Sequence, residues 1–294
     1  MPTTTNPLPS MHGAQVVMAA PAPGPGNWAG AASAVLVDGT IWLVYRVRRP
    51  LSSGRGVAVV IARSSDGVHF EQVCAVRRTD FGAESFERPV LVPLPEGGWR
   101  LYLSCATPGS KHWWIDSLTA ATVEGLVTGE RRVVLPGDDA NALKDPVIEV
   151  RADGWHMWVC CHPLGEPGHE DRMTTRHMTS ADGLSWTDRG VVLRGRPGHW
   201  DARGARVTAV LSHDPLTVLY DGRPDAESNW FERTGVAAVV DGELRALDDV
   251  AIGSPHGDGA LRYACAVLLP DGRTRFYFEA SRPDGAHDLL TSVA

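Results

Sequence analysis

Short runs in which apolar and polar residues alternate make up most of the chain, and turn residues separate them. The segments "SAVLVDGTIWLVYR" (33–46) and "DPVIEVRADGWHMWVCC" (145–161) each place an Asp-Gly pair between two such runs. This is the pattern of a β-hairpin. The chain also contains 31 glycines and 21 prolines, which interrupt helices. The sequence therefore predicts an all-β protein.

The hairpin pattern recurs five times at nearly even intervals. The turns begin at Asp38, Gly97, Asp153, Asp214 and Asp271, with spacings of 59, 56, 61 and 57 residues. A repeat of this length, each unit opening with a hairpin, is typical of a β-propeller. We therefore predict a five-bladed β-propeller with four antiparallel strands per blade. Two β-sandwiches with coincidental spacing are the alternative.

The repeats account for the whole chain as a single domain. The fifth unit ends too early for a fourth strand, so we expect the N-terminal segment 14–20 to supply it. Such a closure would tie the chain ends together and remove an exposed sheet edge. The predicted blades lie near residues 28–80, 84–136, 141–195, 200–250 and 256–294, with 14–20 completing the last.

Composition and charge narrow the classes of partner. The chain has 294 residues and a formal net charge of −7. Without a basic stripe or a long apolar run, we expect no nucleic-acid or membrane partner. The first residues lack the features of a secretory signal. The five cysteines show no zinc-binding spacing, so we expect free thiols, a cytoplasmic protein, and neither metal nor cofactor.

Propeller geometry brings three sets of residues to one face. These are the starts of the first strands, the ends of the second strands, and the loops between the second and third strands. Carboxylates, arginines and tryptophans gather in these segments, whereas the other face carries mainly turn residues. Trp rings pack on the C–H faces of sugars, and carboxylates accept bonds from sugar hydroxyls. We therefore expect a carbohydrate or glycoside as the small-molecule partner.

Five carboxylates on this face are candidate catalytic groups: Asp145, Glu87, Asp221, Glu232 and Asp201. Each also has a structural interpretation. Asp145 could cap its strand or pair with Arg203 or Arg206, and Glu87 could pair with Arg46 or Arg88. Asp201 and Asp221 suit turns, and Glu232 could be a solvated loop charge. The candidate substrate-binding residues are Trp28, Arg46, Arg88, Trp114, His162, Arg203 and Trp230.

Several of these motifs resemble known enzymes. "KDPVIEVRADGWHMW" (144–158) is similar to the Asp-Pro strand of glycoside hydrolase family 43, which implies that Asp145 tunes the catalytic acid and orients the sugar. "GTIWLVYRVRRP" (39–50) is similar to the opening of the family 130 mannoside phosphorylases. "FERP" (86–89) is similar to that family's Glu-Asp-Pro-Arg, with Arg88 in place of the Asp. The chain thus resembles the five-bladed β-propeller glycosidases of families 43, 62, 32 and 130.

Two segments depart from the resemblance. Families 43 and 32 place an essential Asp on the first strand of blade 1, where this chain has "NWAGAASAVLV" (27–37). Family 43 carries its acid Glu where this chain has "WDARGARV" (200–207). We expect a glycoside-hydrolase-like enzyme with paired carboxylates. The alternatives are a phosphorylase of the family 130 type, with Arg46, Arg88 and Arg203 binding phosphate, and a non-catalytic sugar-binding propeller.

Overall fold

The computed structural model describes residues 6–169, 171–247 and 251–294. Within these ranges the regular structure consists of β-strands and three short 3₁₀ turns, η1 (Leu51–Ser53), η2 (Arg78–Phe81) and η3 (Glu124–Thr128). The all-β prediction is confirmed. None of the described helices has the length and apolar character needed to cross a membrane.

Three antiparallel sheets each contain four strands that follow one another along the chain. The first comprises β6 (Val90–Pro93), β7 (Trp99–Ala106), β8 (Trp113–Ala120) and β9 (Glu130–Leu135). The second comprises β10 (Asn141–Arg151), β11 (Gly154–Pro163), β12 (Thr174–Ser180) and β13 (Thr187–Leu193). The third comprises β14 (Ala205–His213), β15 (Leu216–Gly222), β16 (Arg233–Val240) and β17 (Glu243–Ala246).

The fourth sheet joins the two ends of the chain. Its order is β18 (Leu261–Leu268), β19 (Thr274–Ser281), β20 (His287–Val293), β2 (Trp28–Val37), β3 (Thr40–Arg48), β4 (Gly56–Ser64) and β5 (Glu71–Arg77). Strands β20 and β2 meet in one parallel pair, Trp28 with His287. The N-terminal strand β1 (Gln15–Met18) pairs antiparallel with β20. The expected pairing of the N-terminal segment with the end of the chain is therefore present.

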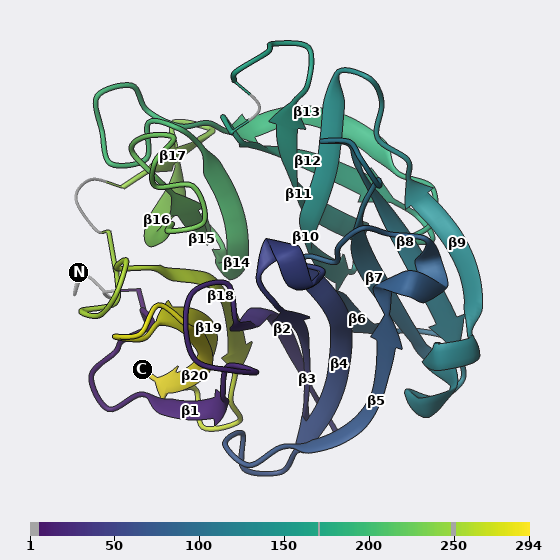
Figure 1. Ribbon diagram of the computed structural model, residues 1–294. Coiled ribbons are helices and arrows are strands. Elements are labelled where there is room, and N and C mark those ends of the chain that lie inside the picture. The colour runs from purple at the N-terminus through teal and green to yellow at the C-terminus, as the bar shows by residue number, and fades with distance from the viewer. Residues whose placement is uncertain (1–5, 170, 248–250) are drawn as a thin grey trace.

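The sheets are arranged around a common centre (Figure 1). The first strand of each four lies innermost, and these strands contact one another in a ring: β2 with β6, β6 with β10, β10 with β14, β14 with β18, and β18 with β2. Apolar clusters fill the spaces between neighbouring sheets. One cluster packs Val59 and Ile61 of β4 against Leu101 and Leu103 of β7. Burial of these side chains holds adjacent sheets together.

Three of the inner strands carry the same irregularity. The pairing register shifts at Gly30/Ser33 in β2, at Lys144/Val147 in β10 and at Arg262/Cys265 in β18. Each shift contains a non-glycine residue in the left-handed region: Ala31 (φ 51°), Asp145 (φ 55°) and Tyr263 (φ 53°). This conformation is uncommon for such residues. A bulge changes the direction in which side chains point. In each of these three strands, two neighbouring residues near the centre therefore depart from the regular alternation of the strand.

Candidate functional site

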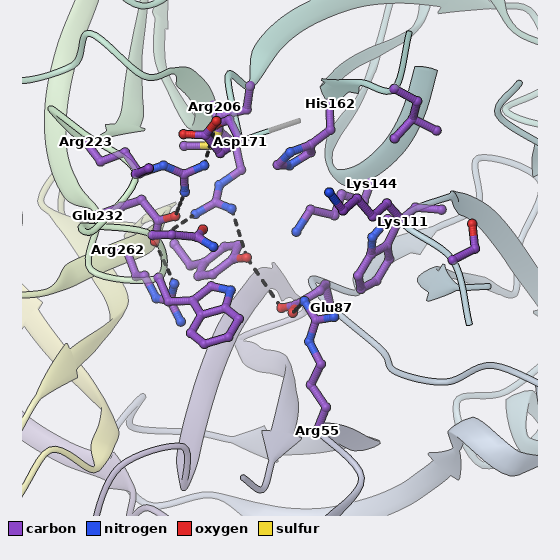
Figure 2. A pocket seen from close by; sticks show the side chains of 18 residues that line it. Arg55, Glu87, Lys111, Lys144, His162, Asp171, Arg206, Arg223, Glu232 and Arg262 are labelled. Atoms are coloured by element: carbon purple, nitrogen blue, oxygen red, sulfur yellow. Dashed lines mark hydrogen bonds and ion pairs between the residues drawn. The ribbon is translucent and has the colours of Figure 1, made fainter. Parts of the chain in front are cut away.

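A cavity of about 430 Å³ opens where the inner strands begin. Figure 2 shows charged side chains converging on it from several strands and loops. Six lining residues are cations: Arg55, Lys111, Lys144, Arg206, Arg223 and Arg262. Three lining residues are carboxylates: Glu87, Asp171 and Glu232. The aromatic lining residues are Trp113, Trp230 and Tyr263.

Four of the charged residues occupy equivalent positions on their inner segments. Each stands opposite a residue near the end of the second strand. The pairs are Glu87 with Ser104, Lys144 with Cys160, Arg206 with Asp221, and Arg262 with Glu279. In β2 the position belongs to Gly30, opposite Arg46. A Cβ there would lie 2.1 Å from Oε2 of Glu279, so the Glu279 carboxylate takes the space that a side chain of β2 would need.

Glu87 is a buried carboxylate held in its ionised form. It is 3% exposed and pairs with Arg46 and, at 3.4 Å, with Arg55 Nη2. Burial opposes ionisation, but the charges of Arg46, Lys144 and Arg55 outweigh it, and the pKa of Glu87 lies well below its ordinary value. An ionised carboxylate is suited to act as a base or nucleophile rather than as a proton donor.

Glu232 faces the cavity from the loop before β16. Arg223 Nη1 and Arg262 Nη1 each donate to one of its oxygens at 2.6 Å. Burial works against its ionisation, yet the nearby Arg262, Arg206 and Arg223 lower the pKa of Glu232 far below the ordinary value. Like Glu87, it is a carboxylate whose charge arginines stabilise.

Asp145 and Asp221 lie behind the cavity wall, and neither is exposed. Arg206 links them: its Nη1 donates to Asp145 Oδ2 at 3.0 Å and its Nη2 to Asp221 Oδ2 at 2.7 Å. Burial opposes ionisation of Asp145, but Lys144 and Arg206 lower its pKa. Burial raises the pKa of Asp221. These two carboxylates are placed to orient Arg206, which does line the cavity.

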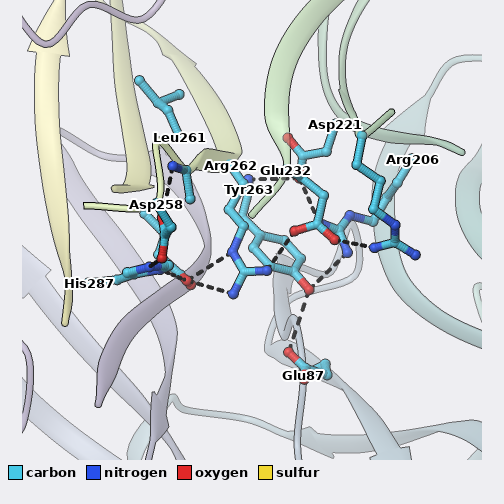
Figure 3. A network of polar contacts seen from close by, with 12 residues as sticks. Glu87, Arg206, Asp221, Glu232, Asp258, Leu261, Arg262, Tyr263 and His287 are labelled. Atoms are coloured by element: carbon cyan, nitrogen blue, oxygen red, sulfur yellow. Dashed lines mark hydrogen bonds and ion pairs between the residues drawn. The ribbon is translucent and has the colours of Figure 1, made fainter. Parts of the chain in front are cut away.

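Tyr263 connects Asp145 to Glu87, as Figure 3 shows in part. Its hydroxyl lies 3.2 Å from Asp145 Oδ2 and 3.5 Å from Glu87 Oε2. These two carboxylate oxygens are therefore at most about 7 Å apart. Burial raises the pKa of Tyr263 well above its ordinary value, so the phenol keeps its proton.

Of the predicted substrate-binding residues, two line the cavity and two lie directly behind its wall. Trp230 and His162 line the cavity. Trp28 lies behind this wall, stacked on His287 at 4.4 Å with the Arg48 guanidinium 3.7 Å from its ring centre. Arg46, fully buried, bridges Glu87 and Glu279. Trp28 and Arg46 thus support the site from behind rather than facing a ligand.

The last four predicted residues also lie outside the lining of this cavity. Asp201 is buried, accepting bonds from Arg196 and from the Tyr220 hydroxyl at 2.8 Å. Arg203 pairs with Asp171 at 2.7 Å and lines a neighbouring groove. Arg88 lines a separate cavity. Trp114 packs on the core between β3, β4 and β7.

The Trp114 prediction missed the neighbouring aromatic residue by one position. Trp113 lines the cavity, with Lys144 Nζ 4.8 Å and the Arg55 guanidinium 5.2 Å from its ring centre. Successive side chains of a strand point to opposite faces, so only one of two adjacent tryptophans in β8 can face the ligand. Aligning the repeats residue by residue would also have placed Arg262 and Tyr263 beside Lys144 and Asp145.

Other chemistry receives little support from the described side chains. In residues 6–169, 171–247 and 251–294 no cluster of three or more His, Cys, Asp or Glu residues has the arrangement of a metal site. The five cysteines are free thiols. The cavity therefore offers ionised carboxylates, guanidinium and ammonium groups, and aromatic faces.

Comparison with known proteins shows which fold this chain shares. The chain matches no protein-family model, and the curated proteins contain no significant match to its sequence. Solved structures do match. One, from work on the family 130 mannoside phosphorylases and the glycoside hydrolases among them that target β-1,2 mannosidic linkages in Candida mannan, has a TM-score of 0.63 at 16% identity. The alignment covers 99% of this chain and 95% of that one.

Two further structures come from other glycosidase families. A thermostable family 43 glycoside hydrolase matches with a TM-score of 0.71 at 14% identity, over 90% of this chain and 88% of the other. The Bombyx mori family 32 β-fructofuranosidase matches with a TM-score of 0.67 at 14% identity, over 95% of this chain and 62% of the other. The chain shares the fold of the β-propeller glycosidases. The resemblance predicted from the sequence is confirmed at this level.

Proposed function

We propose that the fold is a five-bladed propeller in which every blade has four strands. The ring of contacts among β2, β6, β10, β14 and β18 supports this. In this interpretation the eight-stranded sheet consists of the first blade, β2 to β5, and the last blade, β18 to β20 with β1. The single parallel pair between Trp28 and His287 is then a contact between blades rather than a true ladder.

On this framework we propose a carbohydrate-active enzyme of the glycoside hydrolase type. The observation that supports it best is that two ionised carboxylates, Glu87 and Glu232, line the same cavity. Glycoside cleavage ordinarily uses two carboxyl groups that flank the scissile bond. In this proposal the glycoside binds against Trp113 and Trp230, and its hydroxyls donate to Glu232.

The carboxylates then have different roles. Glu87, ionised and facing the cavity, accepts the proton of the attacking group. The Lys144 ammonium, which lines the same cavity, donates a proton to the leaving oxygen as the glycosidic bond breaks. Asp145 has no exposed surface, so it acts as a positioning residue through Arg206 and the Tyr263 hydroxyl. Glycoside cleavage ordinarily requires two carboxylates that both touch the substrate. We assign the second position to Glu232, which lines the cavity. Asp221 holds Arg206 in place. Asp201 binds Arg196 and the Tyr220 hydroxyl of β15. Neither carboxylate lines the cavity.

A screen for turnover tests this function. Purified protein is incubated with aryl glycosides and with oligosaccharides of both anomeric configurations, and released sugars are detected. Turnover by the wild type, lost in Glu232→Gln and retained in Glu243→Gln, supports the proposal. Glu243 is an exposed carboxylate on β17 and serves as the matched control. Binding of sugars without turnover supports a sugar-binding propeller instead.

A second candidate function is a glycoside phosphorylase. The observation that favours it is the excess of cations in the lining, six against three carboxylates. Arg55 and Lys144 both approach the Trp113 ring, and Lys111 lines the same cavity. Phosphate would find positive charge there. None of the three cations expected for phosphate, Arg46, Arg88 and Arg203, lines this cavity. Cleavage that requires inorganic phosphate and yields a sugar phosphate would establish this function over hydrolysis.

The cysteines support a reducing compartment, and we propose a cytoplasmic location. Four of the five thiols are buried, and burial raises the pKa of Cys160 to about 12 and of Cys265 to about 11. Such thiols are poorly reactive. Fractionation of cells that express the protein tests the location.

A further inference from the structure

A second cavity, which we call the central cavity, lies within the ring of inner strands. Its volume is about 390 Å³, and residues of β2, β6, β10, β14 and β18 all contribute to its wall. Most of the wall is apolar, built from valine, leucine, isoleucine and alanine side chains. Nothing in the proposed glycosidase function uses this cavity, because Glu87 faces the first cavity and its neighbour Arg88 faces this one.

Arg88 is a buried cation whose guanidinium forms no ion pair among the described residues. It is 2% exposed, and its Nε and Nη1 are buried without a hydrogen-bond partner. Burial lowers the pKa of Arg88. A buried charge without a partner carries a large desolvation cost. The charges of Asp145 and Asp221 offset this cost only in part, since burial still lowers the pKa and both carboxylates pair with Arg206.

Two hydroxyl groups in the same wall are also unsatisfied. Ser33 of β2 and Thr208 of β14 line the central cavity, and their side-chain oxygens are buried with no partner among the described atoms. The wall also holds a partly exposed carboxylate, Glu149, whose Oε2 is buried without a hydrogen-bond partner and lies 3.6 Å from His213 Nε2. Burial raises the pKa of Glu149, which favours its uncharged form. Three segments of the wall thus present donors to one space. Buried polar groups are normally satisfied, so their shared lack of an acceptor points to a ligand that accepts.

We propose that the central cavity binds a small monovalent anion, chloride under cellular conditions. The Arg88 guanidinium supplies the charge, and the hydroxyls of Ser33 and Thr208 donate hydrogen bonds. The other arginine of the wall, Arg151, is exposed and pairs with Asp153 at 3.5 Å. The single buried cation, Arg88, balances one negative charge, whereas a phosphate or sulfate dianion would leave charge unbalanced against apolar walls. A halide also needs few donors and tolerates contact with apolar side chains.

The anion site is joined to the first cavity through the backbone of Arg88. The Arg88 N–H donates to Asp145 Oδ1 at 3.1 Å, and the Ser104 hydroxyl donates to the Arg88 carbonyl at 2.9 Å. The same Ser104 oxygen accepts from the Asp145 N–H at 2.9 Å. An anion that fixes Arg88 therefore also fixes the segment that carries Glu87. This site stands whether or not the glycosidase proposal does.

Crystals equilibrated with sodium bromide test the site directly. The expected result is an anomalous bromide peak in the central cavity, in contact with Arg88, in the wild type. The peak should persist in Arg63→Met, which removes an exposed arginine of β4 that pairs with Glu71. It should be absent in Arg88→Met. A guanidinium of Arg88 that contacts only water at saturating bromide would overturn the proposal.

Thermal unfolding provides the solution test. A ligand that binds the folded state raises Tm as its concentration rises. At constant ionic strength, replacing gluconate by chloride should raise Tm in the wild type and in Arg63→Met but not in Arg88→Met. If Arg88→Met does not fold, Ser33→Ala and Thr208→Val provide the test, since both retain the cation. Each should raise the chloride concentration that gives half of the Tm increase by about tenfold. An equal chloride response in all variants would contradict the site.

Discussion

At the scale of single residues, arginine decides how each carboxylate of the site behaves. Glu87, Glu232 and Asp145 would be protonated more readily if burial acted alone, but guanidinium or ammonium groups reverse the direction of each pKa shift. Asp221 is the exception, because burial outweighs the Arg206 guanidinium and the hydrogen bond from the Tyr263 N–H. For Glu87 and Asp145 the sequence allowed two interpretations, function or arginine pairing. The alternative for Glu232, a solvated loop charge, is wrong because this side chain is 2% exposed. The structure shows the pairing and leaves the cavity-facing groups ionised.

A single residue, Gly30, explains why the first inner strand carries no carboxylate. Gly30 leaves room for Glu279, which binds Arg46 and Arg262. We predict that Gly30→Ala displaces Glu279 and lowers the free energy of unfolding by about 1–3 kcal/mol, the usual cost of overpacking. Chemical denaturation measures this loss.

The control for that variant is Gly165→Ala. A Cβ at Gly165 meets no atom within 4 Å, so this change should leave the unfolding midpoint unaltered. Equal midpoints for Gly30→Ala and the wild type would show that Glu279 does not depend on the space above Gly30.

At the scale of elements, the regular parts of the repeat were predictable and the irregular parts were not. The Asp-Gly turns located the hairpins, and the alternating segment near residue 15 was expected to pair with the last strand, as β1 does. The bulges at Ala31, Asp145 and Tyr263 left no clear mark in the sequence, because they depend on contacts between inner strands. Arg55, Asp171 and Arg223 reach the cavity from connecting segments, whose paths a periodic pattern does not specify.

The alternation of β8 separates two adjacent tryptophans. We predict that Trp113→Ala raises KM for the substrate by about tenfold, because it removes an aromatic face from the cavity. Trp114→Ala should leave KM unchanged and lower Tm instead, since Trp114 packs on the core. Steady-state kinetics and thermal unfolding of both variants check this. A KM effect confined to Trp114→Ala would place the wrong residue in the cavity.

At the scale of the whole molecule, the sign of the site's charge differs from that of the chain. The chain carries a net charge of −7, yet cations outnumber carboxylates two to one in the lining of the first cavity. The repeat predicted that carboxylates, arginines and tryptophans gather on this face. It did not predict the excess of cations, because Lys144 and Arg262 were not among the candidate site residues. The sequence thus predicted the architecture better than the electrostatics.

The buried carboxylates predict how stability depends on pH. The pKa values of Glu87, Asp145, Glu232 and Glu279 are lowered in the folded state. The unfolded chain therefore binds more protons at acidic pH, and stability that is present at neutral pH is lost as the pH falls below about 5. Asp221, with a raised pKa, offsets one of the four. Urea unfolding between pH 7 and pH 3 should show a falling midpoint, and a midpoint that rises on acidification would contradict these shifts.

The central claim is that Glu87 acts as the base of a glycoside-cleaving site. The most direct measurement is kcat of Glu87→Gln on the best glycoside found for the wild type, compared with Glu71→Gln, an exposed carboxylate on β5. Circular dichroism establishes that both variants are folded. We predict that kcat falls by about 10²- to 10⁴-fold in Glu87→Gln, the usual contribution of a general base, and is unchanged in Glu71→Gln. A folded Glu87→Gln variant with the wild-type kcat would contradict the account.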